Sequence, residues 1–393
     1  MKKLLILVLC FAFFFALTGC AGETVSEKAA SLSADTDSPS GVCVSVDILS
    51  VNKHGNVILD ASIDKMKASG FDVGDIVTVR AGDESFDLPV GTSYTDVDSG
   101  QMICRYDTED DQVALAINYG SFASVTGIAE KITVDGDPGY RWEIRYPSVT
   151  VEIREKGGYL DQYNARNLTR TDDREDYPGL TDEQFANFRV TVAGGRELTL
   201  YRGSSPVDPS LGRNAYVMAA MERAGIKTVI NLTDSKDTME GYAAYPGSYY
   251  SGCAIVNAQM SYDYLTEEFS AKIRESVEAI IDNEGPYLVH CKEGKDRTGV
   301  LCAVLECFAG ASAKEVESDY METYFNYYGV KPSDAACGII YDNNLRKTLS
   351  ALFGVEDIEG CDLRDCAEKY LLSVGLTDRQ LSALSERLSG VRD

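Results

Sequence analysis

A cysteine and an arginine separated by five residues are the pair in this chain best suited to chemistry. Cys291 and Arg297 lie in the run His-Cys-Lys-Glu-Gly-Lys-Asp-Arg-Thr-Gly at residues 290–299. A thiolate is a strong nucleophile, and a guanidinium binds two phosphate oxygens at once. Backbone N–H groups of a short loop add further donors to an anion. The spacing therefore predicts a phosphate-binding loop with Cys291 as nucleophile. The other residues expected to bind phosphate there are Lys292, Glu293, Gly294, Lys295 and Thr298.

The flanking residues indicate the elements that position this loop. An apolar Tyr-Leu-Val run at 287–289 precedes it, and an apolar run at 299–305 follows it. This order predicts a strand, a tight loop and a helix N-terminus, where the helix dipole favours an anion.

The same alternation extends over residues 187–393. Helices are expected at 213–224 and 266–283, and strands at 226–232 and 253–257. Alternating strands and helices of this length predict an α/β domain with a mostly parallel central sheet. Anion sites in such sheets lie at the carboxyl ends of the strands, where Cys291 falls.

The ten-residue run resembles the signature of the cysteine-dependent protein tyrosine phosphatase superfamily. Its inner Gly-Lys-Asp-Arg-Thr-Gly is similar to a bacterial branch that acts on phosphotyrosine and, in some members, on phosphoserine or phosphoinositides. Leu-Thr-Leu-Tyr-Arg-Gly-Ser-Ser-Pro at 198–206 also resembles the start of that domain. In the resembling branch, a lysine at the place of Lys295 goes with multiply phosphorylated headgroups. A simpler alternative is that Lys295 only stabilises the thiolate.

The general acid is less well specified by the sequence. A phenol or inositol leaving group needs a proton donor within hydrogen-bond reach. Asp296 matches the aspartate inside the loop of the resembling branch. Asp263 lies where the superfamily's mobile acid loop falls, and Asp234 is a third candidate. We favour Asp296 slightly, because no Trp-Pro-Asp loop is present.

The amino-acid composition limits the partners and cofactors that the protein could use. The net charge is −25, which disfavours nucleic acid as a partner except at a local basic site. Two histidines and the absence of a Cys-x-x-Cys pair leave metal sites without support, so we expect neither metal nor cofactor. Cys302 and Cys307 read as core residues, and the spacing leaves open whether Cys361 and Cys366 form a disulfide.

The N-terminus predicts export and lipid anchoring. A short basic start and an apolar run to Leu17 are typical of a signal peptide. Leu-Thr-Gly-Cys at 17–20 resembles the bacterial lipobox, in which the cysteine, here Cys20, is lipidated. We expect a signal peptide at 1–19, a flexible tether at 20–41, and a lipid-anchored protein on the extracytoplasmic face of the membrane.

Residues 42–160 show a different pattern. Short alternating segments separated by Gly, Asp and Asn predict a small all-β domain, either a barrel or a sandwich. Four short segments resemble the C-terminal β-domain of SAM hydroxide adenosyltransferases. They are Asn-Lys-His-Gly-Asn-Val at 52–57, Phe-Asp-Val-Gly-Asp at 71–75, Ser-Tyr-Thr-Asp-Val at 93–97 and Ala-Ile-Asn-Tyr-Gly-Ser at 116–121. That family's catalytic N-terminal domain is not part of the resemblance, so we interpret the region as a spacer or ligand-binding module.

A charged segment, residues 164–187, precedes the core of the predicted phosphatase-like domain at 161–393. It is expected to wrap around the start of that domain, and its Arg166, Arg170 and Arg174 read as solvated.

The sequence therefore predicts a cysteine-dependent phosphomonoester hydrolase for phosphotyrosine proteins or for phosphoinositides and inositol phosphates. Two alternatives stay open. One is a sulfurtransferase or arsenate reductase with a similar cysteine loop. The other is a catalytically idle lipoprotein that binds phospholigands.

Overall fold

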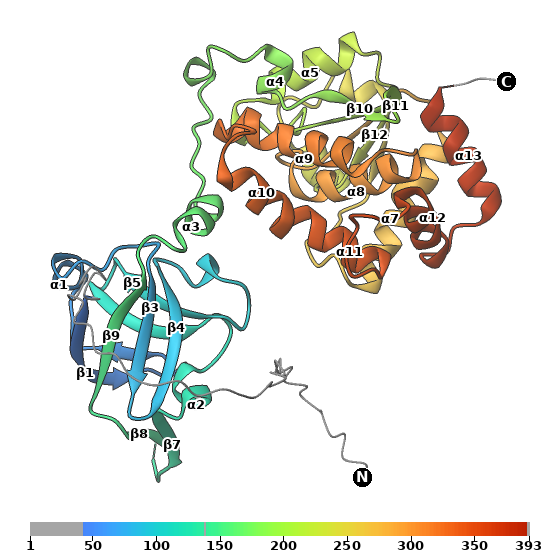
Figure 1. The fold of residues 1–393 in the computed structure, drawn as a ribbon. Coiled ribbons are helices and arrows are strands. Elements are labelled where there is room, and N and C mark those ends of the chain that lie inside the picture. Colours follow the sequence, from blue (N-terminus) through green and yellow to red (C-terminus); the bar gives the residue numbers. More distant parts are fainter. Residues whose placement is uncertain (1–41, 137–138, 391–393) are drawn as a thin grey trace, which may run out of the picture. The chain divides into compact units, whose positions relative to one another are not determined.

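The structure is a computed structural model that describes residues 42–136 and 139–390 (Figure 1). The predicted signal peptide and tether, with Cys20, lie outside the described residues. Within the described ranges, no helix is long and apolar enough to cross a membrane. The nine cysteines of these ranges are free, Cys361 and Cys366 included.

The N-terminal region is a closed barrel, which confirms its predicted all-β character and decides between barrel and sandwich. The strand order is β1-β2-β6-β5-β4-β3-β9, and β4 and β5 are its parallel pair. The bounds are β1 Cys43–Val51, β2 Val57–Leu59, β3 Ile76–Ala81, β4 Glu84–Gly91, β5 Met102–Asp107, β6 Gln112–Ile117 and β9 Ser148–Glu155. Along β3, Val77 and Val79 are fully buried whereas their neighbours are not. This alternation is what a small filled barrel requires.

Smaller elements complete the barrel region and the segment after it. The barrel carries helices α1 (Ile63–Ala68) and α2 (Phe122–Thr126) and a hairpin of β7 (Ala129–Thr133) and β8 (Tyr140–Ile144). Helices α3 (Leu160–Arg166) and α4 (Asp182–Phe185) follow. The side chain of Thr181 caps α4, as its sequence predicts, and forms a capping box with Gln184.

The C-terminal region is built on a five-stranded sheet of order β10-β11-β14-β12-β13. The bounds are β10 Arg189–Ala193, β11 Arg196–Gly203, β12 Thr228–Asn231, β13 Ala254–Asn257 and β14 Tyr287–His290. Four strands run parallel, and β10 pairs antiparallel with β11 at the edge. The predicted α/β class is therefore confirmed, with a mixed rather than a purely parallel sheet.

Helices cover both faces of this sheet because successive strand residues point to opposite sides. Val289, Ile230 and Leu200 pack with helices from α7 onward, whereas Leu288 and Val229 pack with α5. The helices are α5 Asn214–Arg223, α6 Lys236–Glu240, α7 Glu267–Asp282, α8 Asp296–Phe308, α9 Ala313–Tyr328, α10 Ala335–Tyr341, α11 Lys347–Phe353, α12 Leu363–Ser373 and α13 Asp378–Ser389. A π-helix, Asp342–Arg346, joins α10 to α11.

Helix α8 occupies the centre of the larger core. Every residue from Arg297 to Phe308 is buried, Cys302 and Cys307 among them. A helix that is apolar on all sides is stable only when other elements surround it. Helices α7, α9 and α12 contribute to the same core, so the loop that begins α8 rests on a rigid base.

The start predicted for the helix at 266–283 is confirmed, and strand β12 is shorter than predicted. Thr266 and Thr377 cap α7 and α13 with their hydroxyl groups. Strand β12 has four residues where the apolar run suggested seven, because the flanking Ile226 and Leu232 are buried outside the ladder. The helices at 335–353 were not predicted, since Gly338 and a polar Asp-Asn-Asn run at 342–344 interrupt the apolar period.

Candidate active site

Four parallel strands end at one level of the sheet. Gly203 and Asn231 both lie beside His290, and Asn257 lies beside Asn231. The segments that follow these strands therefore start at one edge, where ligands of open α/β sheets bind. One of these segments is the phosphate loop, residues 291–297, between β14 and α8.

The phosphate loop turns sharply at Gly294. This residue has φ +68°, and an added Cβ would lie 2.2 Å from the carbonyl oxygen of Gly203. Both the left-handed backbone and the close approach to β11 exclude a side chain here. Cys291 lies at the base of the turn with 3% of its surface exposed.

Three successive backbone carbonyl groups of the loop point away from its interior and accept hydrogen bonds. The oxygens of Lys292, Glu293 and Gly294 accept hydrogen bonds from groups outside the loop. The donors are Ser205 N (3.1 Å) to Lys292, Asn187 Nδ2 (3.1 Å) and Tyr327 OH (3.0 Å) to Glu293, and Arg202 Nη2 (2.8 Å) to Gly294. In a trans peptide the N–H points opposite to the C=O. The next three N–H groups, of residues 293–295, therefore face the inside of the loop.

A buried charge cluster holds Arg202 in this position. Asp319 accepts hydrogen bonds from Arg202 and from Arg189, the latter at 2.6 Å. Burial alone would raise the pKa of Asp319, but the charges of Arg189 and Arg202 outweigh it and lower that pKa to about 2. The cluster is thus ionised over the working range of pH and braces the loop from behind.

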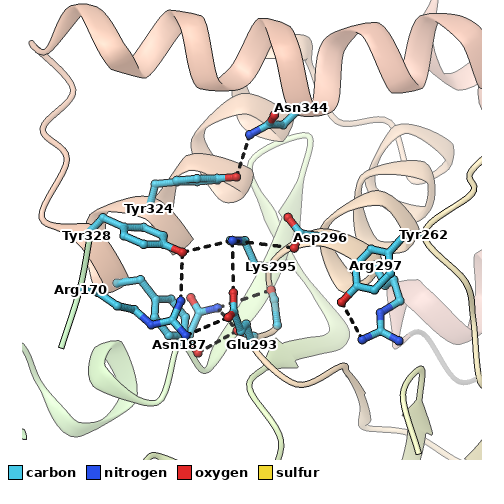
Figure 2. Close-up of polar contacts among 12 residues, drawn as sticks. Arg170, Asn187, Tyr262, Glu293, Lys295, Asp296, Arg297, Tyr324, Tyr328 and Asn344 are labelled. Atoms are coloured by element: carbon cyan, nitrogen blue, oxygen red, sulfur yellow. Dashed lines mark hydrogen bonds and ion pairs between the residues drawn. The ribbon is translucent and has the colours of Figure 1, made fainter. Parts of the chain in front are cut away.

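Arg297 closes the other side of the loop and is 8% exposed. Its Nη1 donates to the carbonyls of Leu232 (3.3 Å) and Met260 (3.2 Å), and its Nη2 donates to the Tyr262 hydroxyl at 2.9 Å (Figure 2). Among the described residues, its Nε and the Thr298 hydroxyl are buried without a hydrogen-bond partner. Arg297 ends the loop that carries Cys291 and Thr298 follows it in α8, so each group is available to a ligand at the loop.

His290 makes contacts through both nitrogens of its ring, and one of them joins it to the loop. Its Nδ1 lies 3.1 Å from the carbonyl of Cys291, and its Nε2 lies 2.9 Å from the hydroxyl of Tyr250. Burial lowers the pKa of His290 to about 4, so the ring is neutral at pH 7. A carbonyl accepts only, so Nδ1 carries the hydrogen and Nε2 accepts from Tyr250.

The three candidate acids differ in their surroundings. Asp296 is half-buried at the first turn of α8, and burial raises its pKa. Asp234 follows β12, accepts a hydrogen bond from Asn231 at 3.2 Å, and also has its pKa raised by burial. Asp263 is exposed in the segment before α7. Partial burial thus distinguishes Asp234 and Asp296 from the exposed Asp263.

Lys295 belongs to a cluster of alternating charge (Figure 2). Its ammonium lies 3.2 Å from Glu293 and 3.8 Å from Asp296, and it donates to the Tyr328 hydroxyl at 3.1 Å. Glu293 also accepts from Arg170 at 2.8 Å. Lys292, by contrast, is exposed, and it takes part in the loop through its backbone.

Lys295 is also one of the residues that line a pocket of about 260 Å³. Tyr324 and Tyr328 of α9 and Asn344 of the π-helix are among its lining residues, and Asn344 donates to Tyr324 at 2.9 Å. The tyrosines at helical spacing in α9 were expected to be core. Tyr320, Tyr324 and Tyr327 are buried, whereas Tyr328 is half-buried and reaches the phosphate loop.

Several supporting residues were not predicted. Arg170 was interpreted as solvated, but its side chain is only 16% exposed and is paired with Glu293. Arg174 is likewise paired, with Asp182. Asn187 has φ +52°, a left-handed backbone conformation that is uncommon outside glycine. This conformation is visible in the structure but not in the sequence.

A cysteine delivered by a central parallel strand into a loop of inward N–H groups, with an arginine at the loop's end, defines a phosphate-loop α/β domain. Residues 200–390 match the model of the tyrosine phosphatase family, which confirms the resemblance predicted for this region. The match covers slightly under half of the chain. The resemblance of the barrel region to SAM hydroxide adenosyltransferases stays a prediction.

Several solved structures align with part of this chain at low sequence identity. An uncharacterized conserved protein from Thermotoga maritima is 22% identical, with 28% of this chain and 36% of that chain covered and a TM-score of 0.23. The core catalytic domain of the PP-IP phosphatase SIW14 from S. cerevisiae is 20% identical, with coverages of 40% and 85% and a TM-score of 0.26. P. aeruginosa TpbA in complex with phosphotyrosine is 18% identical, with coverages of 51% and 95% and a TM-score of 0.29. No curated protein matches the chain.

The contact between Gly294 and Gly203 predicts the effect of one added methyl group. Gly294→Ala should lower both phosphatase turnover and the free energy of unfolding, the latter by roughly 2 kcal/mol or more, because its Cβ would overlap β11. Gly329→Ala is the matched control, since Gly329 has a similar φ of +63° but open space around it. It should cost only about 1 kcal/mol and leave turnover unchanged. Urea unfolding and initial rates measure both, and equal effects of the two variants would contradict the steric argument.

Proposed function

We propose that this protein is a phosphomonoester hydrolase that uses Cys291 as nucleophile and forms a phosphocysteine intermediate. The observation that carries the proposal is the set of loop carbonyls held outward, which turns successive N–H groups toward the space above Cys291. A dianionic phosphate is the ligand that such donors and a neighbouring guanidinium favour.

The first step is an in-line attack of the Cys291 thiolate on phosphorus. A P–S bond forms while the P–O bond to the leaving group breaks, and the leaving oxygen takes a proton from the general acid. Arg297 and the N–H groups of the loop stabilise the charge on the three equatorial oxygens.

The second step is hydrolysis of the phosphocysteine by water. The same carboxylate accepts a proton from the attacking water, and phosphate leaves as the P–S bond breaks. The unpartnered hydroxyl of Thr298, one residue beyond Arg297, is suited to donate a hydrogen bond to the departing sulfur. His290, being neutral and bonded on both nitrogens, takes no part in proton transfer.

Two substrate classes follow from the surroundings of the loop. Tyr262 is 60% exposed and lies beside Arg297, which suits a flat aryl group such as phosphotyrosine. Lys295 is a second cation beside Arg297 and would have to exchange its contact with Glu293 for a second phosphate, as in phosphoinositides and inositol phosphates. Comparing kcat/KM on phosphotyrosine peptides and on inositol phosphates decides between them.

Substitution of the nucleophile tests the reaction class. In metal-free buffer, the wild type should hydrolyse p-nitrophenyl phosphate with inhibition by vanadate. Cys291→Ser should lose turnover by a factor on the order of 10⁴, and Arg297→Lys by about 10²–10³. Cys361→Ser is the matched control, because Cys361 is a free thiol outside the loop.

The outcomes separate the alternatives. A wild type that binds vanadate but turns nothing over would indicate an idle phospholigand-binding protein. Turnover of thiosulfate or arsenate in place of phosphate esters would indicate the sulfurtransferase or arsenate-reductase reading.

We assign Asp296 as the general acid, with Asp234 and Asp263 as the alternatives. Asp296→Asn should reduce kcat/KM on phenyl phosphate, whose leaving group needs a proton, by about 10²-fold. It should change kcat/KM on p-nitrophenyl phosphate much less, because that leaving group departs without a proton and kcat/KM reports only the first step. Asp234→Asn and Asp263→Asn are the controls. A selective loss on phenyl phosphate in one of them, with Asp296→Asn active, would transfer the role to that residue.

We also propose that the protein is anchored by a lipid on Cys20 at the extracytoplasmic face of the bacterial membrane. The support is the lipobox-like run at 17–20 after an apolar segment. Wild-type protein expressed in a bacterium should incorporate labelled palmitate and fractionate with membranes, whereas Cys20→Ser should do neither. Processing that globomycin does not inhibit would argue against lipidation.

A further inference from the structure

Four side chains of alternating charge form a chain that ends at the assigned acid. The order is Arg170, Glu293, Lys295, Asp296, with separations of 2.8, 3.2 and 3.8 Å between the charged atoms (Figure 2). The last distance is too long for a good hydrogen bond, whereas the first is ideal. The Lys295 ammonium is therefore bonded more closely to Glu293 than to Asp296, although it interacts with both carboxylates.

Arg170 fixes the position of Glu293 from outside the matched family region. It lies in the charged segment at 164–187, upstream of residue 200, where the family match begins. Its guanidinium also donates to the Tyr328 hydroxyl at 3.0 Å and lies 4.7 Å from the centre of the Tyr327 ring. Its Nε donates to Asp172 at 3.1 Å, so Arg170 is held on several sides and its charge is shared between Asp172 and Glu293.

The electrostatic effects along the chain have consistent signs. Burial would raise the pKa of Glu293, but the hydrogen bond from Arg170 and the charge of Lys295 lower it. Burial would lower the pKa of Lys295, but Asp296, two tyrosines and Glu293 raise it. Glu293 is thus ionised and shares its charge between two cations.

Asp296 responds to several charged and titratable groups. From the phosphate loop it is influenced by Lys295, Glu293 and Arg297, and from β11 by Arg202. Tyrosines of α9 and of the segment before α7 also lie within reach. They are Tyr320, Tyr324, Tyr262 and Tyr264. Among these groups, Lys295 is the cation that pairs with both Glu293 and Asp296, so Glu293 competes with Asp296 for it.

We propose that Arg170 is a positioning residue of the reaction: by holding Glu293, it sets how strongly Lys295 is drawn away from Asp296, and so the pH at which Asp296 keeps its proton. The inference rests on the proposed function, in which Asp296 protonates the leaving group. It adds a residue of the upstream segment to the machinery of the phosphatase-like region.

The proposal predicts opposite shifts from the two ends of the Arg170–Glu293 pair. Activity that needs protonated Asp296 falls as pH rises through the pKa of that group, which gives the basic limb of kcat/KM. Glu293→Gln removes a negative charge and frees Lys295 to pair with Asp296, so the basic limb should move to lower pH by about one unit. Arg170→Gln leaves Glu293 to pair with Lys295 alone, so the limb should move to higher pH by about half a unit.

The test uses the full chain and phenyl phosphate as substrate, with p-nitrophenyl phosphate as the substrate that needs little acid catalysis. Arg170→Gln should have no further effect in a Glu293→Gln background, because Arg170 acts through Glu293. Arg170→Lys keeps the charge and should restore the wild-type limb. Arg174→Gln is the matched control: Arg174 lies in the same segment and pairs with Asp182 instead.

Thermal unfolding of each variant separates loss of folding from a shift of the limb. Limbs that stay in place, that move in the same direction in both single variants, or that still respond to Arg170→Gln in the double variant would overturn the inference. A wild type without Cys291-dependent turnover at any pH would overturn the proposed function instead, so the two failures are distinguishable.

Discussion

The site depends on the orientation of a few peptide groups in one loop. A peptide cannot present its N–H to a phosphate unless its carbonyl is accepted elsewhere, since an unpaired buried carbonyl is costly. Ser205, Arg202, Asn187 and Tyr327 supply those partners, from β11, the turn before β10 and α9. The rest of the C-terminal region can be understood as the frame that brings these donors behind the loop.

The residues behind the loop include buried charges, whose removal from water costs free energy. Pairing each buried charge with one of opposite sign offsets this cost. Arg202 is almost completely buried, and it is tolerated because Asp319 accepts from it and from Arg189. Removing Asp319 would deprive both buried arginines of the carboxylate with which they pair. The same principle applies at the front of the loop, where Glu293 lies between Arg170 and Lys295.

The phosphate loop could be predicted because ten consecutive positions form it, between an apolar strand and an apolar helix. The α/β class and the all-β region could be predicted for a similar reason, since apolar periodicity is local. The partners of the loop could not. Arg202 is 92 positions from Gly294, Asn187 is 106 from Glu293, and Arg170 is 123 from Glu293. No local sequence pattern distinguishes an arginine that is exposed to solvent from one that contacts a loop far away in the sequence.

The place of Asn187 and β10 has a practical consequence for domain boundaries. A fragment cut where the family match begins, at residue 200, would lose both of them and part of β11. The outer edge of β11 would then be open to pairing with other chains, a common route to aggregation. The carbonyl of Glu293 would keep only Tyr327 as a donor. A fragment that keeps these donors and β10 must therefore start before Asn187, upstream of the residues that match the family model.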